Sequence, residues 1–110
     1  MSVNECFGRW RVVVDPELED ELQGPFYPGN IVDRFLRLLK ELEEDLNEDP
    51  YAIIRLSREP IVDKNLNLRR IRIGKYRAWF IIIPEDCSVV FLDLGSREKF
   101  YEHYRKRRAR

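Results

Sequence analysis

Arginines gather around a Gly74-Lys75 pair in residues 68–79, which read LRRIRIGKYRAW. Alternation of polar and apolar residues on both sides of the pair predicts two antiparallel strands joined by a two-residue type II′ turn. With side chains of period two, the predicted register gathers four residues on one face of the sheet: Arg70, Arg72, Arg77 and Trp79. Like charges directly opposite each other destabilise a sheet. We therefore expect this face to bind an anion, and the leading candidate is an RNA backbone with a base stacked beside it.

Length and hydropathy predict one soluble domain spanning residues 1–110, with residues 105–110 as a frayed basic tail. No apolar run approaches the roughly 20 residues that a membrane-spanning helix needs. The first residues lack the basic and apolar regions of a secretory signal. We therefore expect a cytoplasmic protein with no membrane partner.

Charge is unevenly distributed along a chain whose formal net charge is zero. Residues 1–65 hold 8 Lys or Arg and 15 Asp or Glu, whereas residues 66–110 hold 12 and 5. A basic region of this kind is typical of nucleic-acid binding, although the two halves could instead neutralise each other across the fold. Charged residues make up 36% of the chain, Thr is absent and Gln23 is the single Gln, a composition that indicates a thermophile.

Cysteine and histidine do not predict a metal or cofactor site. Cys6 and Cys87 are far apart and match no metal-binding spacing, so we expect two reduced thiols. A disulfide remains the alternative if the source is a hyperthermophile. His103 is the single His, and we expect it to be a surface or packing residue of a final helix.

The remaining pattern predicts an α+β domain of order β-α-α-β-β-β, with a helical hairpin packed on a small antiparallel sheet. A strand is expected at 9–14, and Asp15-Pro16 is typical of a helix start. Asn30 is expected to cap a longer helix with an apolar stripe that packs in the core. Residues 51–65 could extend a helix or cross the sheet. Further strands are expected around Gly74-Lys75 and at 89–94, and a short helix at 98–104.

Two segments resemble a known family, the RelE/ParE toxin superfamily. They are residues 68–77 and residues 94–101, LGSREKFY. Members commonly show a basic strand, a Gly-x-Tyr-Arg turn, an apolar strand and then Gly-x-Arg-x-x-x-Tyr. The resemblance covers residues 66–101 closely, whereas the earlier part agrees in the order of elements.

The resemblance implies the toxin of a type II toxin–antitoxin system. Such a RelE-like toxin would be a metal-independent endoribonuclease that cleaves messenger RNA in the ribosomal A site by 2′-hydroxyl transesterification. Its partners would be messenger RNA, the ribosome and an acidic antitoxin that covers Arg72 or Arg77, or displaces residues 97–110. A ParE-like gyrase poison and a non-catalytic protein that binds nucleic acid or antitoxin are the alternatives.

Carried over by position, the resemblance names the site residues. The catalytic candidates carried over are Arg70, Arg72, Arg77, Arg97 and Tyr101. Beside them, and not carried over from the family, the nucleic-acid-binding candidates are Arg69, Lys75, Trp79 and Lys99. Some members have two lysines where this chain has Arg70 and Arg72. Arginine stays protonated in proteins and cannot act as a base, so we expect Tyr101 to transfer the proton. The arginines could instead pair with Asp93, with Glu85 or with the acidic first half of the chain, and Trp79 could belong to the core.

Overall fold

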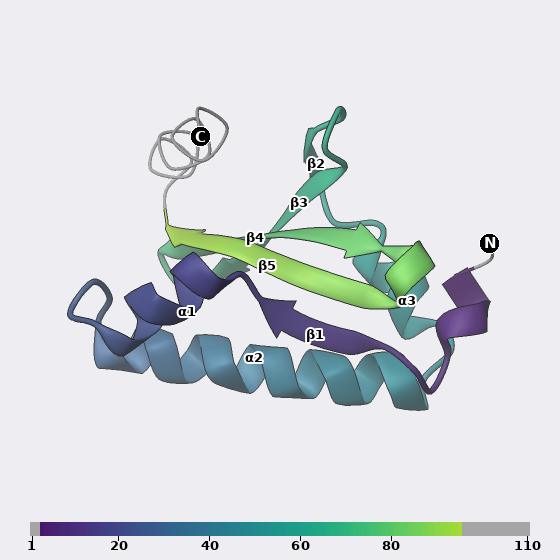
Figure 1. The fold of residues 1–110 in the computed structure, drawn as a ribbon, viewed down its shortest axis with the longest axis horizontal. Coiled ribbons are helices and arrows are strands. Elements are labelled where there is room, and N and C mark those ends of the chain that lie inside the picture. The colour runs from purple at the N-terminus through teal and green to yellow at the C-terminus, as the bar shows by residue number, and fades with distance from the viewer. Residues whose placement is uncertain (1–2, 96–110) are drawn as a thin grey trace.

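The computed structural model describes residues 3–95, in which three helices pack with a five-stranded sheet (Figure 1). The elements in chain order are a 3-10 helix Val3–Cys6, β1 Arg11–Val14, α1 Pro16–Gln23, α2 Gly29–Glu48, α3 Ala52–Leu56, β2 Ile61–Asp63, β3 Leu68–Ile73, β4 Tyr76–Ile83, a 3-10 helix Pro84–Asp86 and β5 Ser88–Gly95. This confirms the α+β class. The helix expected at 98–104 lies outside the described residues.

The sheet has the strand order β1-β5-β4-β3-β2. Strands β2 to β5 pair antiparallel, as expected, but β1 pairs with β5 in parallel. The sheet is therefore mixed, which corrects the prediction of an antiparallel sheet. Parallel neighbours need a long crossover connection, and here the chain passes through all three helices and three strands before β5 returns beside β1.

The hairpin of β3 and β4 has the predicted register. Arg72 pairs with Arg77, Arg70 with Trp79 and Ile73 with Tyr76. Gly74 has φ +58°, and Lys75 is not among the residues with positive φ. This combination fits a type II′ turn, which needs positive φ at its first central position alone.

The structure confirms one of the two predicted helix caps and contradicts the other. Asp15 caps α1 and accepts a hydrogen bond from the Glu17 N–H at 3.2 Å, with Pro16 at the first helical position, as predicted. The N-cap of α2 is Pro28, however, so the expected cap at Asn30 was wrong. The backbone of Pro28 is extended, with ψ 141°, and its carbonyl accepts the first N–H bonds of α2, so the helix begins before Asn30.

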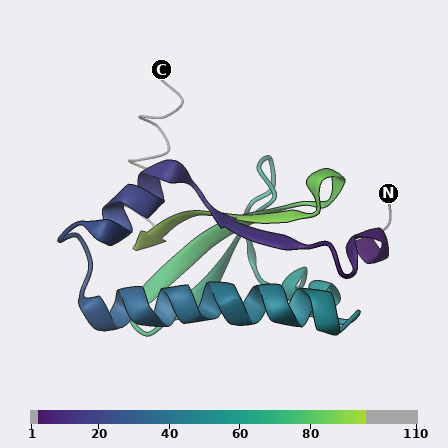
Figure 2. The same cartoon turned by 60° about the horizontal axis from the view of Figure 1, so that its bottom comes forward.

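Helix α2 runs along one face of the sheet in both views (Figures 1 and 2). Its apolar stripe is buried or partly buried in the main core: Ile31, Phe35, Leu38, Leu39, Leu42 and Leu46. The Phe35 ring meets the Phe91 ring of β5 edge to face, with centroids 5.4 Å apart. This confirms the core assignment of the stripe. The unassigned stretch 51–65 forms α3 and the short strand β2.

Strand β4 is covered on both faces, as its apolar sequence indicates. Phe80 is fully buried in the main core on the face that α2 covers, and Trp79 is fully buried on the opposite face. There Trp79 packs in a second, smaller cluster with Leu68 and with partly buried residues of the neighbouring strands and loop. The arginine face of the hairpin therefore continues into an apolar cluster.

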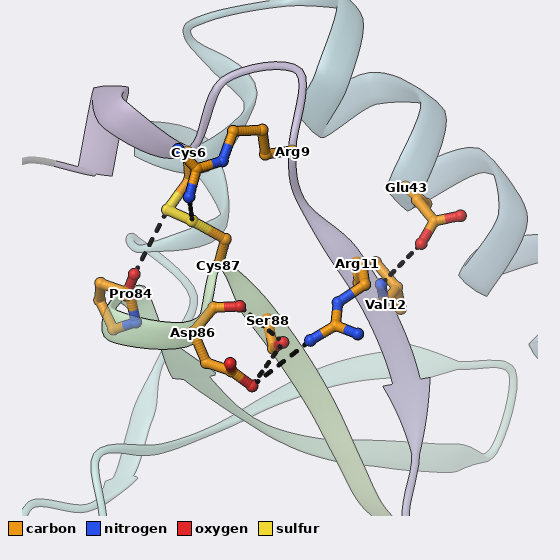
Figure 3. Close-up of polar contacts among 9 residues, drawn as sticks. All are labelled: Cys6, Arg9, Arg11, Val12, Glu43, Pro84, Asp86, Cys87 and Ser88. Carbon is orange, nitrogen blue, oxygen red and sulfur yellow. Dashed lines mark hydrogen bonds and ion pairs between the residues drawn. A yellow bond between two sulfur atoms is a disulfide. The ribbon is translucent and has the colours of Figure 1, made fainter.

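A disulfide joins Cys6 to Cys87, with Cα atoms 5.3 Å apart, which corrects the expectation of two reduced thiols (Figure 3). Cys6 ends a 3-10 helix, while Cys87 ends a tight turn with left-handed φ of +49°. These turns precede β1 and β5, and the parallel pairing of those strands brings the two cysteines together. That pairing joins parts of the chain 81 residues apart, so spacing rules for nearby cysteines could not reveal it.

Candidate anion-binding site on the arginine hairpin

Three arginines of the hairpin line one pocket of about 220 Å³, which we call the arginine pocket. Its lining residues are Glu59, Pro60, Arg70, Arg72 and Arg77. The register of β3 and β4 sets Arg72 directly opposite Arg77, while Arg70 precedes Arg72 by one period of the strand. The predicted register is confirmed, and it places the three arginines in the lining of one pocket.

Among the described residues, the arginine pocket has an excess of positive charge, with three arginines and one glutamate in its lining. Within residues 3–95 the ion pairs are Arg11–Asp86, at 3.6 Å, and Arg55–Asp49, at 2.7 Å, so neither involves a pocket residue. The alternative in which the hairpin arginines pair with Asp93 or Glu85 has no counterpart among these contacts. Arg70 and Arg77 are half-buried and Arg72 is exposed. Each guanidinium group has N–H donors that can form bidentate hydrogen bonds with two phosphate oxygens, so arginines suit a phosphate ligand.

The acidic member of the arginine pocket is Glu59, which the sequence analysis did not identify. It lies in the connection between α3 and β2, inside the stretch that the sequence pattern left unassigned. Its backbone carbonyl accepts a hydrogen bond from Arg69 Nη1 at 2.9 Å, which ties this connection to β3. A carboxylate can accept a proton, whereas the three arginines cannot. The pocket therefore combines anion-binding groups with one possible base.

The described nucleic-acid-binding candidates occupy different positions. Lys75 is exposed in the hairpin turn. Arg69 is half-buried and bonds to Glu59 and, at 3.2 Å, to Asn67 Oδ1, so it holds the β2–β3 loop. Trp79 is fully buried and has no exposed ring surface on which a base could stack. Its burial agrees with the alternative that Trp79 belongs to the core and corrects its assignment to nucleic-acid binding.

Three candidates, Arg97, Lys99 and Tyr101, lie outside the described residues. The described chain ends at Gly95, which pairs directly with Arg77 at the end of β5. The last described residue, Gly95, therefore lies next to a residue of the arginine pocket.

Charge at the far end of α2 is arranged differently. Asp49 follows the helix, and its hydrogen bond with Arg55 lowers the pKa of the Asp49 carboxyl below its ordinary value of 3.8.

Within residues 3–95, no group of His, Cys, Asp and Glu side chains has the arrangement of a metal site. No helix in this part of the chain is both long and apolar enough to cross a membrane.

The sequence matches no protein-family model and no curated protein. The structure, in contrast, is similar to solved RelE structures. The toxin–antitoxin complex RelBE2 from Mycobacterium tuberculosis matches with a TM-score of 0.58 and 19% identity over 80% of this chain and 98% of that chain. A doubly substituted Escherichia coli RelE toxin in the free state matches with a TM-score of 0.58 and 16% identity over 89% and 96%.

An archaeal structure has a higher sequence identity. The RelE–RelB complex from Pyrococcus horikoshii OT3 matches at 26% identity and a TM-score of 0.50, over 80% of this chain and 94% of that chain. Each of the three matches covers nearly the whole of the compared chain. The similarity therefore extends well beyond the hairpin that first indicated this family. The protein has a RelE-like fold.

Proposed function

We propose that this protein is the toxin of a type II toxin–antitoxin system, acting in the cytoplasm as an endoribonuclease on messenger RNA in the ribosomal A site. The observation that carries the proposal is the arginine pocket on a RelE-like fold, lined by three arginines that form no ion pair within residues 3–95. A gyrase poison has no need of such a phosphate-binding pocket. Two of the similar structures are toxin–antitoxin complexes, which supports an antitoxin as the second partner.

The reaction is attack of a ribose 2′-oxygen on the adjacent phosphorus. A base takes the 2′-hydroxyl proton as the new P–O bond forms, and the P–O5′ bond breaks as an acid protonates the leaving 5′-oxygen. The products are a 2′,3′-cyclic phosphate and a 5′-hydroxyl. Arg70, Arg72 and Arg77 bind the phosphate and stabilise the charge that develops on it, with Arg97 as the predicted fourth cation.

The base and the acid are assigned to different residues. Glu59 lines the arginine pocket and, as a carboxylate, can accept the 2′-hydroxyl proton. Tyr101, which lies outside the described residues, stays our predicted proton-transfer residue. With Glu59 as the base, we assign Tyr101 the protonation of the leaving oxygen. Some members of the family have lysines at the positions of Arg70 and Arg72, and an arginine cannot accept a proton as a lysine can. Glu59 would supply the proton acceptor in this chain.

Cleavage of a programmed messenger on ribosomes, mapped by primer extension, tests the anion-binding role. We expect Arg77→Ala to reduce the cleavage rate by about 10²–10³, the usual effect of removing one preorganised charge donor. The same loss is expected for Arg97→Ala, and Arg77→Lys should rescue poorly because an ammonium cannot form the bidentate contact. Arg11→Ala, an exposed arginine on the opposite edge of the sheet, is the matched control. Normal cleavage by both the Arg77→Ala and Arg97→Ala proteins would favour a non-catalytic protein.

A second pair of variants tests proton transfer. Glu59→Gln keeps the shape of the side chain but cannot accept a proton, and Tyr101→Phe removes the hydroxyl alone. Each should slow cleavage by about 10²–10⁴ in a protein with an unchanged melting temperature. If either variant cuts at the wild-type rate under saturating protein, that residue has no part in proton transfer.

A further inference from the structure

A second pocket of about 220 Å³ lies between α2 and the hairpin, and we call it the α2 pocket. Its lining residues are Arg34, Arg37, Leu38, Glu41, Arg72 and Ile73. Helix α2 comes very close to the hairpin turn here, since a β-carbon built on Gly74 would lie 3.0 Å from Arg34 Nη1. The glycine of the turn therefore leaves room for the Arg34 guanidinium beside the backbone.

The α2 pocket is positively charged. Its lining contains three arginines, Arg34, Arg37 and Arg72, and one acidic residue, Glu41. None of these four side chains takes part in the ion pairs formed within residues 3–95. Three cations and one anion in the lining of one pocket leave an excess of positive charge, which an external anion would compensate.

Arg72 lines both the α2 pocket and the arginine pocket, so the two pockets are neighbours. The sheet allows this because β2 is short and pairs with β3 at Leu68 and Arg69 alone. Within residues 3–95, no strand pairs with the outer edge of β3 from Arg70 to Ile73, and Arg72 lies on this edge between the two pockets. Two neighbouring anion sites that share one arginine suit a ligand with regularly repeated negative charges.

We propose that the α2 pocket is a second phosphate site, which binds an RNA backbone phosphate next to the one held in the arginine pocket. The proposal rests on the proposed function for its ligand, although binding does not require cleavage. A backbone phosphodiester has two non-bridging oxygens, as a carboxylate does, but RNA carries one such charge at every nucleotide. This regular repeat matches two neighbouring pockets that share Arg72. This favours RNA over an acidic peptide.

RNA oligonucleotides with 2′-O-methyl groups cannot undergo the transesterification, so they measure binding without cleavage. We expect Arg34→Gln and Arg37→Gln each to weaken binding of a hexanucleotide roughly tenfold, as for loss of a charged hydrogen bond. Each should also reduce the slope of log affinity against log salt by about 0.7, the value for one phosphate on a single strand. Binding of a dinucleotide, whose one phosphate occupies the arginine pocket, should not change.

Lys40→Gln is the matched control, because Lys40 is an exposed cation of α2 that does not line the pocket. An equal effect of Lys40→Gln would indicate diffuse attraction and overturn the second site. The site is also overturned if wild-type protein binds no hexanucleotide, or if both arginine variants bind it normally. In the latter case, continued loss of cleavage by Arg77→Ala would leave the proposed function standing. A weakening seen with an acidic peptide but not with RNA would assign the α2 pocket to a protein partner.

Discussion

The two sides of the sheet differ in whether side chains or strands form hydrogen bonds with the backbone groups at the edge. At the β1 edge, Asn47 of α2 accepts a hydrogen bond from the Trp10 N–H at 2.7 Å and donates one to the Trp10 carbonyl at 2.9 Å. Glu43 of α2 accepts another from the Val12 N–H at 2.9 Å (Figure 3). At the opposite side, no strand of the described residues pairs with the outer edge of β3 beyond Arg69.

This difference indicates that the two halves of α2 have different roles. Its last turns carry acidic and amide side chains that cover the β1 edge, whereas its first turns carry the arginines of the α2 pocket. Covering an edge prevents unwanted strand pairing, and charge near a free edge serves the same purpose. We infer that the β1 edge is built for stability, and that the β3 edge keeps its charges available for a ligand.

The disulfide provides the strongest test of the β1 edge. Replacing both Cys6 and Cys87 by Ser should lower the free energy of unfolding by about 2–5 kcal/mol, because the bond closes a long loop of the unfolded chain. Urea unfolding of wild-type protein with and without dithiothreitol gives the same comparison without a substitution. Binding of the hexanucleotide by the folded variant should remain normal. Equal unfolding midpoints under the two conditions would mean that the disulfide does not stabilise this edge.

Asn47→Ala tests the polar cover on β1. It removes two hydrogen bonds and leaves the N–H and carbonyl of Trp10, whose side chain is buried, without these partners. We expect a loss of about 2 kcal/mol in the free energy of unfolding, measured by urea titration. The neighbouring Glu48→Ala, an exposed residue of the same turn, is the control. A similar small effect of both substitutions would mean that the cover contributes little.

Gly74→Ala tests the open edge and has the smallest expected effect. A β-carbon is disfavoured at φ +58° and would also approach Arg34 Nη1, so we expect a loss of about 1 kcal/mol in stability. Displacement of Arg34 should weaken hexanucleotide binding in the same variant. Gly29→Ala is the matched control, because a β-carbon there meets nothing within 4 Å and φ is not positive. Equal melting temperatures for the two variants would contradict the strained turn.

Local sequence patterns were sufficient for much of the fold and for the centre of the candidate site. Period-two alternation and Gly74 determined the hairpin register that aligns Arg72 with Arg77. Asp15 and Pro16 determined the start of α1, and the apolar stripe determined which side of α2 is buried. These features depend on interactions between residues that are close in the chain, and such interactions leave a readable pattern.

Contacts between distant parts of the chain decided the rest. The parallel pairing of β1 with β5 made the sheet mixed and brought Cys6 to Cys87. Packing of α2 on the sheet placed Arg34 beside Gly74. The hydrogen bond from Arg69 to the Glu59 carbonyl holds the α3–β2 connection beside the arginine pocket. Trp79 became buried because a second apolar cluster forms on its face. Each of these outcomes depends on where whole elements dock, which periodicity and turn chemistry within a single segment cannot determine.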